Sequence, residues 1–145
     1  ADHADQAAAE GMAISEFPTT LVAAERARAR GMSIVMGAPN YLRGGSQSGN
    51  IAVSELLARG LVDALASDYV PRSLLDAAFR LADDPDTPHD LPAAIALVSD
   101  APARMAGLGD RGRIAEGLRA DLVAVRMVAG QPVVQAVWRQ GKQVY

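Results

Sequence analysis

Short apolar runs alternate with amphipathic segments through the first half of the chain. The apolar runs lie at residues 12–16, 32–36 and 61–67, and the segments with helical spacing at 18–30, 50–59 and 73–82. Near-continuous apolar runs of this length are typical of strands that a parallel sheet buries on both faces. Strands that alternate with helices predict βαβ units, so we expect an α/β fold with about three βα units.

Individual residues predict where the first helices begin and end. Pro18 and the pair Thr19 and Thr20 precede the first helix, because proline tolerates the first turn and a threonine hydroxyl can cap it. Gly31 and Gly60 are expected to end the first and second helices. The glycine-rich stretch 37–49 predicts a long connection between the second strand and its helix.

The pattern of predicted secondary structure changes in the second half of the chain. A polar break with prolines at residues 82–90 is followed by two helical pieces, 91–99 and 102–108. Beyond it, short β-like runs at 120–128, 132–138 and 143–145 are joined by Gly-Gln and Gly-Lys turns, which predicts antiparallel strands. We therefore divide the chain into an α/β part, 1–108, and a small β part, 109–145.

Charge and composition exclude several classes of function. The net charge is −3 and the acids and bases are interspersed, with Lys142 as the only lysine. No basic stripe favours nucleic-acid binding, and no apolar run approaches the roughly 20 residues that span a bilayer. The acidic amino terminus lacks the pattern of a signal peptide, and there is no cysteine, so a cytoplasmic location is expected.

Two carboxylates follow predicted strands, at positions where α/β folds gather reactive side chains. Asp68 follows the third strand, where it could ligate a metal or accept a proton from water, and could equally cap the next helix. Glu16 follows the first strand, and a partnership with an arginine explains it slightly better than catalysis. His3 and His89 are isolated, and one histidine is no metal site.

The connection at residues 37–50 favours an anion ligand slightly over a merely flexible loop. Its glycines let backbone N–H groups approach a ligand, while Arg43, Ser46 and Ser48 can bond phosphate oxygens. The spacing is not that of a P-loop. The stretch is therefore a candidate phosphate-binding site that does not contain the P-loop motif.

Three strand-end segments together resemble a known family. They are SEFPTT (15–20), MGAPNYLRGGSQSGN (36–50) and SDYVPRSLL (67–75), and the tail adds PARMAGL (102–108) and DRGRIAEGLRADLVAV (110–125). They are similar to the amidohydrolase superfamily and, within it, to the diphosphatases of the carbon–phosphorus lyase pathway. The likeness covers essentially the whole chain.

The resemblance implies a fold and a reaction. The expected fold is the C-terminal part of a TIM-like (β/α)8 barrel, with strands resembling the sixth to eighth, plus a small appended β domain. The expected enzyme is a metal-dependent hydrolase using zinc, manganese or magnesium. It cleaves the 5-triphosphate of alpha-D-ribose 1-methylphosphonate, a small-molecule substrate, to the 5-phosphate and diphosphate.

The resemblance also implies roles for individual residues. Asp68 corresponds to a catalytic residue and metal ligand after the eighth strand, Glu16 to a catalytic position after the sixth, and His3 to a metal ligand after the fifth. We expect Asp68 to point into the same cavity as Glu16 and His3. The implied phosphate-binding residues after the seventh strand are Arg43, Gly44, Gly45, Ser46, Ser48 and Asn50. Two positions depart from the family pattern, with Gln47 in place of a histidine and Ala101 in place of an asparagine.

Length leaves several alternatives open. A complete barrel needs about 250 residues, so a missing N-terminal segment or self-association is expected. The chain is either a truncated copy or part of a split enzyme. Other hypotheses are a non-catalytic barrel remnant or phosphate-binding fragment, and an amidohydrolase that acts on a cyclic amide.

Overall fold

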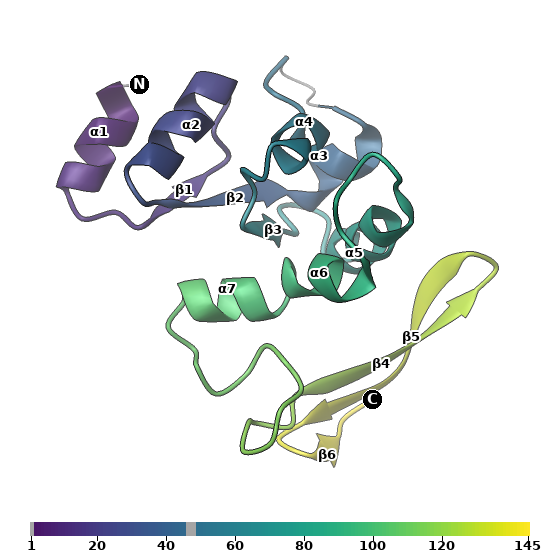
Figure 1. Ribbon diagram of the computed structural model, residues 1–145. Helices are drawn as coiled ribbons and strands as arrows, with labels where there is room; N and C mark the ends of the chain where they lie inside the picture. The colour runs from purple at the N-terminus through teal and green to yellow at the C-terminus, as the bar shows by residue number, and fades with distance from the viewer. Residues whose placement is uncertain (1, 46–48) are drawn as a thin grey trace.

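A three-stranded parallel sheet forms the centre of the first part of the chain. The computed structural model describes residues 2–45 and 49–145, and it orders the strands β1 (Ile14–Glu16), β2 (Ser33–Gly37) and β3 (Ala64–Ala66) (Figure 1). Both neighbouring pairs are parallel, with Val35 opposite Glu16 on one side and opposite Ala64 on the other. The predicted parallel sheet is confirmed, and the described strands form an open three-stranded sheet rather than a closed barrel.

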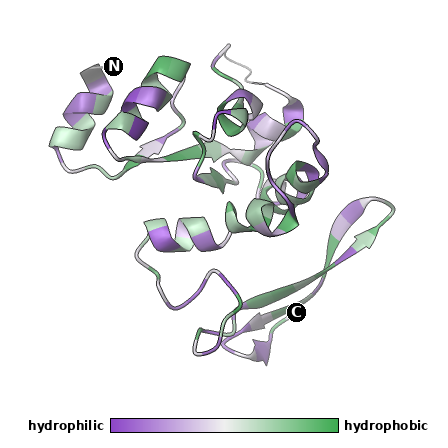
Figure 2. Cartoon of the chain, viewed as in Figure 1, coloured by the Kyte–Doolittle hydropathy of each residue, from purple (hydrophilic) through white to green (hydrophobic). Residues whose placement is uncertain are grey.

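One face of this sheet carries the core. Ile34 and Met36 on β2 and Leu65 on β3 are at most 4% exposed and pack in one apolar cluster. The helices that contribute to the cluster are α2 (Leu21–Ala29), α3 (Ala38–Arg43), α4 (Val53–Ala58), α5 (Ser73–Asp83) and α6 (Leu91–Ala96). Figure 2 shows β2 as a hydrophobic segment between more polar helices.

The opposite face of the sheet is more open. Side chains alternate along a strand, so Ile14, Glu16 and Val35 share the face away from the core cluster. Ile14 is 43% exposed and Glu16 is exposed as well. This face carries the side chains that would point into a barrel if the sheet closed.

The first helix boundaries follow the predicted signals. Thr20 caps α2, and its hydroxyl accepts a hydrogen bond from the Ala23 N–H at 3.2 Å. Gly31 follows the helix with a φ of 75°. The capping threonine and terminating glycine were therefore read correctly from the sequence.

Two helices lie where none was predicted. α3 (Ala38–Arg43) occupies the first half of the stretch expected to be a loop, with Pro39 in its first turn. α1 (Asp2–Ala9) covers the alanine-rich amino terminus and lies beside α2 in Figure 1. Glycines suggested a loop in the first case, yet Gly37 directly precedes α3 and Gly44 directly follows it, so no glycine lies within the helix. α4 also starts later than predicted, at Val53.

The helices after the polar break fasten the edge of the sheet. α6 is capped by Asp90, whose carboxylate accepts from the Ala93 N–H at 2.9 Å. The Leu65 N–H of β3 donates to the Leu97 carbonyl at 2.9 Å, so part of the outer edge of β3 is hydrogen-bonded. α7 (Asp100–Met105) then packs against β3. No helix in residues 2–45 or 49–145 is long and apolar enough to cross a membrane.

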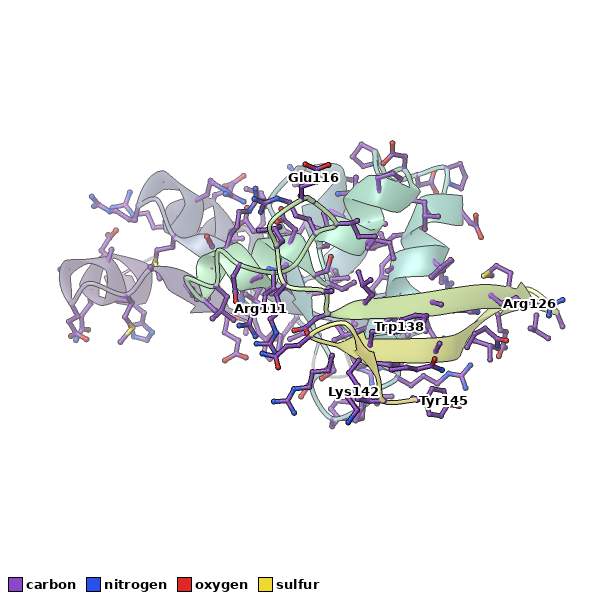
Figure 3. All side chains as sticks on the ribbon, turned by 90° about the horizontal axis from the view of Figure 1, so that it is seen from below. Arg111, Glu116, Arg126, Trp138, Lys142 and Tyr145 are labelled. Atoms are coloured by element: carbon purple, nitrogen blue, oxygen red, sulfur yellow. The ribbon has the colours of Figure 1, made fainter. Side chains whose placement is uncertain are left out.

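The carboxyl terminus forms a separate antiparallel sheet, as predicted. Its strands are β4 (Leu122–Val128), β5 (Gln131–Arg139) and β6 (Lys142–Gln143), in the order β4-β5-β6. Figure 3 shows Arg126 towards one end of this sheet and Lys142 at the other.

The turns of this sheet lie one residue earlier than predicted. They are formed by Ala129 with Gly130 and by Gln140 with Gly141, and all four residues have positive φ. Two consecutive positive φ values match the type I′ hairpin turn, in which glycine favours the second position. Glycine therefore ends each turn instead of beginning it.

We expect Gly112→Ala to destabilise the chain by about 2–5 kcal/mol, and Gly117→Ala by only about 1–2 kcal/mol. Both glycines have positive φ, 97° and 78°, which strains any other residue. At Gly112 an added Cβ would also lie 2.8 Å from the Asp100 Cα and 3.0 Å from the Ser99 carbonyl oxygen, whereas at Gly117 it would meet nothing within 4 Å. Urea denaturation of both variants measures the difference, and equal midpoints would contradict the packing argument.

Candidate active site at the carboxyl ends of the parallel strands

A pocket opens where β1, β2 and β3 end. Among the described residues it is lined by Phe17, Pro18, Met36, Gly37, Asn40, Arg43, Asn50, Ile51, Asp68 and Tyr69. These residues come from the connections that follow all three strands and from α3. Because the strands are parallel, the connections after them meet at one edge of the sheet, where α/β folds bind ligands.

Asp68 reaches this pocket through an unusual backbone conformation. It lies two residues beyond β3 with a φ of 50°, and Phe17, directly after β1, has a φ of 51°. The other described non-glycine residues with positive φ, Ala129 and Gln140, lie in hairpin turns that favour it. Such strain costs about 1–3 kcal/mol and gathers at functional sites.

Both of these side chains lie beside Gly37 at the end of β2. The Asp68 Oδ2 lies 3.8 Å, and the Phe17 Cε1 3.7 Å, from the position that a Cβ on Gly37 would take. Gly37 is two residues beyond Val35, so it faces the same side of the sheet as Glu16. The Asp68 carboxylate thus lies over the inward face of the sheet, on the side that carries Glu16, as we expected.

Glu16 and His3 are not among the residues that line the pocket. Glu16 is exposed on β1, one layer nearer the amino end of the sheet than Gly37. His3 is exposed on α1, in a helix rather than after a strand. The expectation that His3, Glu16 and Asp68 share one cavity is therefore wrong in this structure. Their roles as metal ligand and catalytic residue stay predictions.

Ion pairs explain the position of His3. Asp5 lies two residues after His3 on α1. Its carboxylate accepts hydrogen bonds from Arg26 and Arg30 at 2.7 Å. These hydrogen bonds, first from Arg26 and then from Arg30, hold the pKa of Asp5 well below its usual range. They fasten α1 along α2, which keeps His3 in the helical layer.

The described residues do not bring together the ligands of a metal ion. No group of three histidine, aspartate, glutamate or cysteine side chains in the described ranges is placed to hold one. A catalytic zinc normally takes three protein ligands. Asp68 is the only predicted ligand that lines the pocket, so the described part of the chain offers one ligand rather than a site.

The predicted phosphate-binding residues divide into three groups. Arg43 and Asn50 line the pocket. Gly44 and Gly45 do not, and their N–H groups donate to the Tyr41 and Asn40 carbonyls at 3.0 and 3.1 Å, where they close the end of α3. Ser46 and Ser48 lie outside the described residues. Among the described residues predicted to bind phosphate, the side chains of Arg43 and Asn50 therefore reach the pocket, and the glycine N–H groups do not line it.

Two polar residues of the pocket were not predicted. Asn40 lies on α3, inside the stretch expected to be a loop, and its Oδ1 accepts from the Val53 N–H at 3.4 Å. Tyr69 follows Asp68, and its hydroxyl accepts a hydrogen bond from Arg43 Nη1. The position of Tyr69 beside a strand-end carboxylate was the available signal for it.

Comparisons with known proteins agree with this architecture. The profile of the amidohydrolase family matches residues 2–145. A curated relative from Escherichia coli (strain K12), named alpha-D-ribose 1-methylphosphonate 5-triphosphate diphosphatase, is 55% identical over 135 residues. Those residues are 93% of this chain and 36% of the relative, so the chain spans about a third of the relative's length.

A solved structure supports the fold. The crystal structure of an amidohydrolase from Thermotoga maritima MSB8 superposes with a TM-score of 0.54 and 19% identity, over 86% of this chain and 40% of that one. Likeness at this identity bears on the fold alone. The match of the family profile to nearly every residue, with the parallel sheet and its appended antiparallel sheet, shows that the chain belongs to the amidohydrolase family.

Proposed function

We propose that the pocket binds the triphosphate of alpha-D-ribose 1-methylphosphonate 5-triphosphate during its hydrolysis to the 5-phosphate and diphosphate. The observation that carries this proposal is the meeting of Arg43 and Asp68 at the carboxyl ends of the strands. The E. coli relative, which shares 55% identity over nearly the whole chain, is named for this reaction. In this proposal the chain serves phosphonate catabolism in the cytoplasm.

Arg43 is suited to hold the phosphate groups. A guanidinium offers a planar fork of N–H donors that matches two phosphate oxygens. The amides of Asn40 and Asn50 line the same pocket and can donate further hydrogen bonds. A neutral cyclic amide would not need the charge of Arg43, so the cation favours an anionic substrate.

Asp68 is suited to handle the proton of the attacking water. Hydrolysis breaks one P–O–P bond, and the water that adds to phosphorus must lose a proton as diphosphate departs. A carboxylate at the strand ends can accept that proton as a general base. Asp68, with its positive φ, lines the pocket, and its carboxylate lies beside Gly37, where this transfer would occur.

A divalent metal and a closed barrel are further parts of the proposal. Amidohydrolases generally use divalent metals, and zinc, manganese or magnesium would polarise a phosphoryl oxygen or activate water. Asp68 would supply one ligand, and the described pocket lining holds no second predicted one. We infer that the three parallel strands correspond to the sixth to eighth of a (β/α)8 barrel, whose other strands would complete the site.

A chimera tests the function. This chain would replace the matched 36% of the E. coli diphosphatase, and diphosphate release from the ribose triphosphate would be measured. We expect the chimera to be active. Arg43→Gln should raise KM by about tenfold to a hundredfold, because it removes a hydrogen bond between charged groups. Arg126→Gln, an exposed arginine on β4 outside the pocket, is the matched control and should leave KM unchanged.

Other results would favour the alternatives. Hydrolysis of a cyclic amide without release of diphosphate would indicate a different amidohydrolase reaction. A folded chimera that binds the triphosphate without turnover would indicate a non-catalytic phosphate-binding barrel. An Arg43→Gln chimera with an unchanged KM would remove Arg43 from the phosphate site.

A further inference from the structure

We propose that Tyr69 is a positioning residue, whose phenol hydroxyl holds the Arg43 guanidinium at the pocket mouth in the orientation that binds phosphate oxygens. The inference rests on the proposed function, because it assigns the anion-binding role to Arg43. It adds Tyr69, to which no role was assigned from the sequence alone.

The two side chains come from different strand connections. Arg43 ends α3, which follows β2, and Tyr69 lies after β3. Arg43 Nη1 donates to the Tyr69 hydroxyl, and the Arg43 Cζ lies 5.7 Å from the centre of the Tyr69 ring. Both residues line the pocket beside Asp68. The contact between Arg43 and Tyr69 therefore joins the connection after β2 to the connection after β3.

The partner of Arg43 is neutral, which distinguishes it from most arginines in the described part of the chain. Ion pairs with carboxylates involve Arg26, Arg28, Arg30, Arg59, Arg72, Arg104, Arg111, Arg113 and Arg119. A carboxylate partner fixes a guanidinium but also cancels its charge. A phenol hydroxyl fixes one N–H and leaves the full charge for an anion, with the other N–H donors still available.

The side chain of Tyr69 contributes little to folding. It is 61% exposed, so its ring is not part of the core. The turn that carries it is held by its backbone, since the Val70 N–H donates to the Ser67 carbonyl and the Ser73 N–H to the Val70 carbonyl, at 3.0 and 2.9 Å. Ser73, 1% exposed, also donates its hydroxyl to the Ser67 carbonyl. Removing the Tyr69 hydroxyl should therefore leave the turn in place.

Binding of inorganic tripolyphosphate tests the inference. Titration calorimetry on the chimera with the E. coli diphosphatase, whose other strands would complete the site, would compare the unmodified chimera with Tyr69→Phe, Arg43→Gln and the double variant. We expect Tyr69→Phe to weaken binding by about three- to tenfold, and to have no further effect once Arg43 is replaced. Tyr145→Phe is the matched control, because it removes a hydroxyl from a tyrosine of similar exposure, 69%. This variant should bind tripolyphosphate as the unmodified chimera does.

A spectroscopic measurement separates positioning from a general structural effect. The Arg43 side-chain N–H resonance, identified by its loss in Arg43→Gln, should shift and broaden in Tyr69→Phe. The backbone amide resonances outside the two connections should stay where they are. A Tyr69→Phe spectrum with the Arg43 resonance unchanged would overturn the inference.

The binding outcomes distinguish this inference from the proposed function. If Arg43→Gln weakens binding and Tyr69→Phe does not, Arg43 holds the anion without Tyr69 and only the inference fails. If Tyr69→Phe weakens binding further in the Arg43→Gln background, Tyr69 contacts the anion directly and its positioning role is wrong. If the Arg43→Gln chimera binds as tightly as the unmodified chimera, or the unmodified chimera does not bind, the phosphate site and the inference both fail.

Discussion

The 145-residue chain alone is expected to release no substantial diphosphate from ribose or nucleoside triphosphates, whichever of zinc, manganese or magnesium is added. A catalytic metal takes about three protein ligands in fixed geometry, supported by further hydrogen bonds. Asp68 lines the pocket, whereas Glu16 and His3 do not, and the described residues form no cluster of three ligands. Gln47 also stands where the family usually has a histidine.

The shape of the sheet adds a second reason for low activity. The face that carries Ile14 and Glu16 is open, and the described residues supply no further strands that would close a barrel around the pocket. β4 and β6 are the edge strands of the second sheet, and exposed edges favour association. We therefore expect the isolated chain to be marginally stable or to associate with itself.

Purified chain would be assayed for diphosphate with each metal, with its size measured by light scattering in the same buffer. Asp68→Asn is the control for activity that depends on the pocket. Robust turnover that disappears in Asp68→Asn would show that the chain, alone or as an oligomer, assembles a working site. Turnover that persists in Asp68→Asn would be attributed to a contaminating phosphatase.

Patterns governed by local spacing predicted much of the fold. The apolar runs around Ile34 and Leu65 predicted the central strands, because successive apolar residues are typical of strands in a parallel sheet. Thr20 and Gly31 marked the ends of α2 through hydrogen bonding and backbone conformation of single residues. The antiparallel strands followed from β-branched residues between turns.

The predictions of secondary structure were wrong where the same residue type, such as glycine, occurs in more than one kind of local structure. The glycines after Arg43 suggested a loop throughout 37–49, although Gly44 marks the end of α3. Glycine in the hairpins was placed at the start of each turn, while the type I′ geometry puts Ala129 and Gln140 first. The amino terminus was interpreted by its resemblance to a strand-end histidine, and its alanine-rich helical pattern was missed.

The candidate site was predicted in part, for a physical reason. Asp68, Arg43 and Asn50 follow strands, and parallel strands bring such positions to one edge. The contact between Arg43 and Tyr69 depends on how two connections fold across that edge, which spacing along the chain does not encode. The displacement of His3 likewise depends on the pairing of Asp5 with Arg26 and Arg30.

Asp68→Asn in the chimera with the E. coli diphosphatase is expected to lower kcat by about a hundredfold to ten-thousandfold. An asparagine is nearly the same size, and asparagine also tolerates the positive φ at this position, so the backbone should be preserved. The amide can neither accept the proton of the attacking water nor provide the negative charge that a divalent metal prefers. KM should change less than kcat, because Arg43 and the asparagine amides would still hold the phosphates.

The matched control for this substitution is Asp86→Asn, which removes an exposed carboxylate in the polar break outside the pocket and should leave kcat unchanged. Steady-state kinetics of diphosphate release, with the melting temperature of each chimera, separates loss of chemistry from loss of fold. If Asp68→Asn retains kcat within a few-fold while Asp86→Asn behaves as expected, Asp68 is a structural cap of the connection after β3. The general base would then have to come from elsewhere, and Glu16, on the same face of the sheet, would be the next residue to replace.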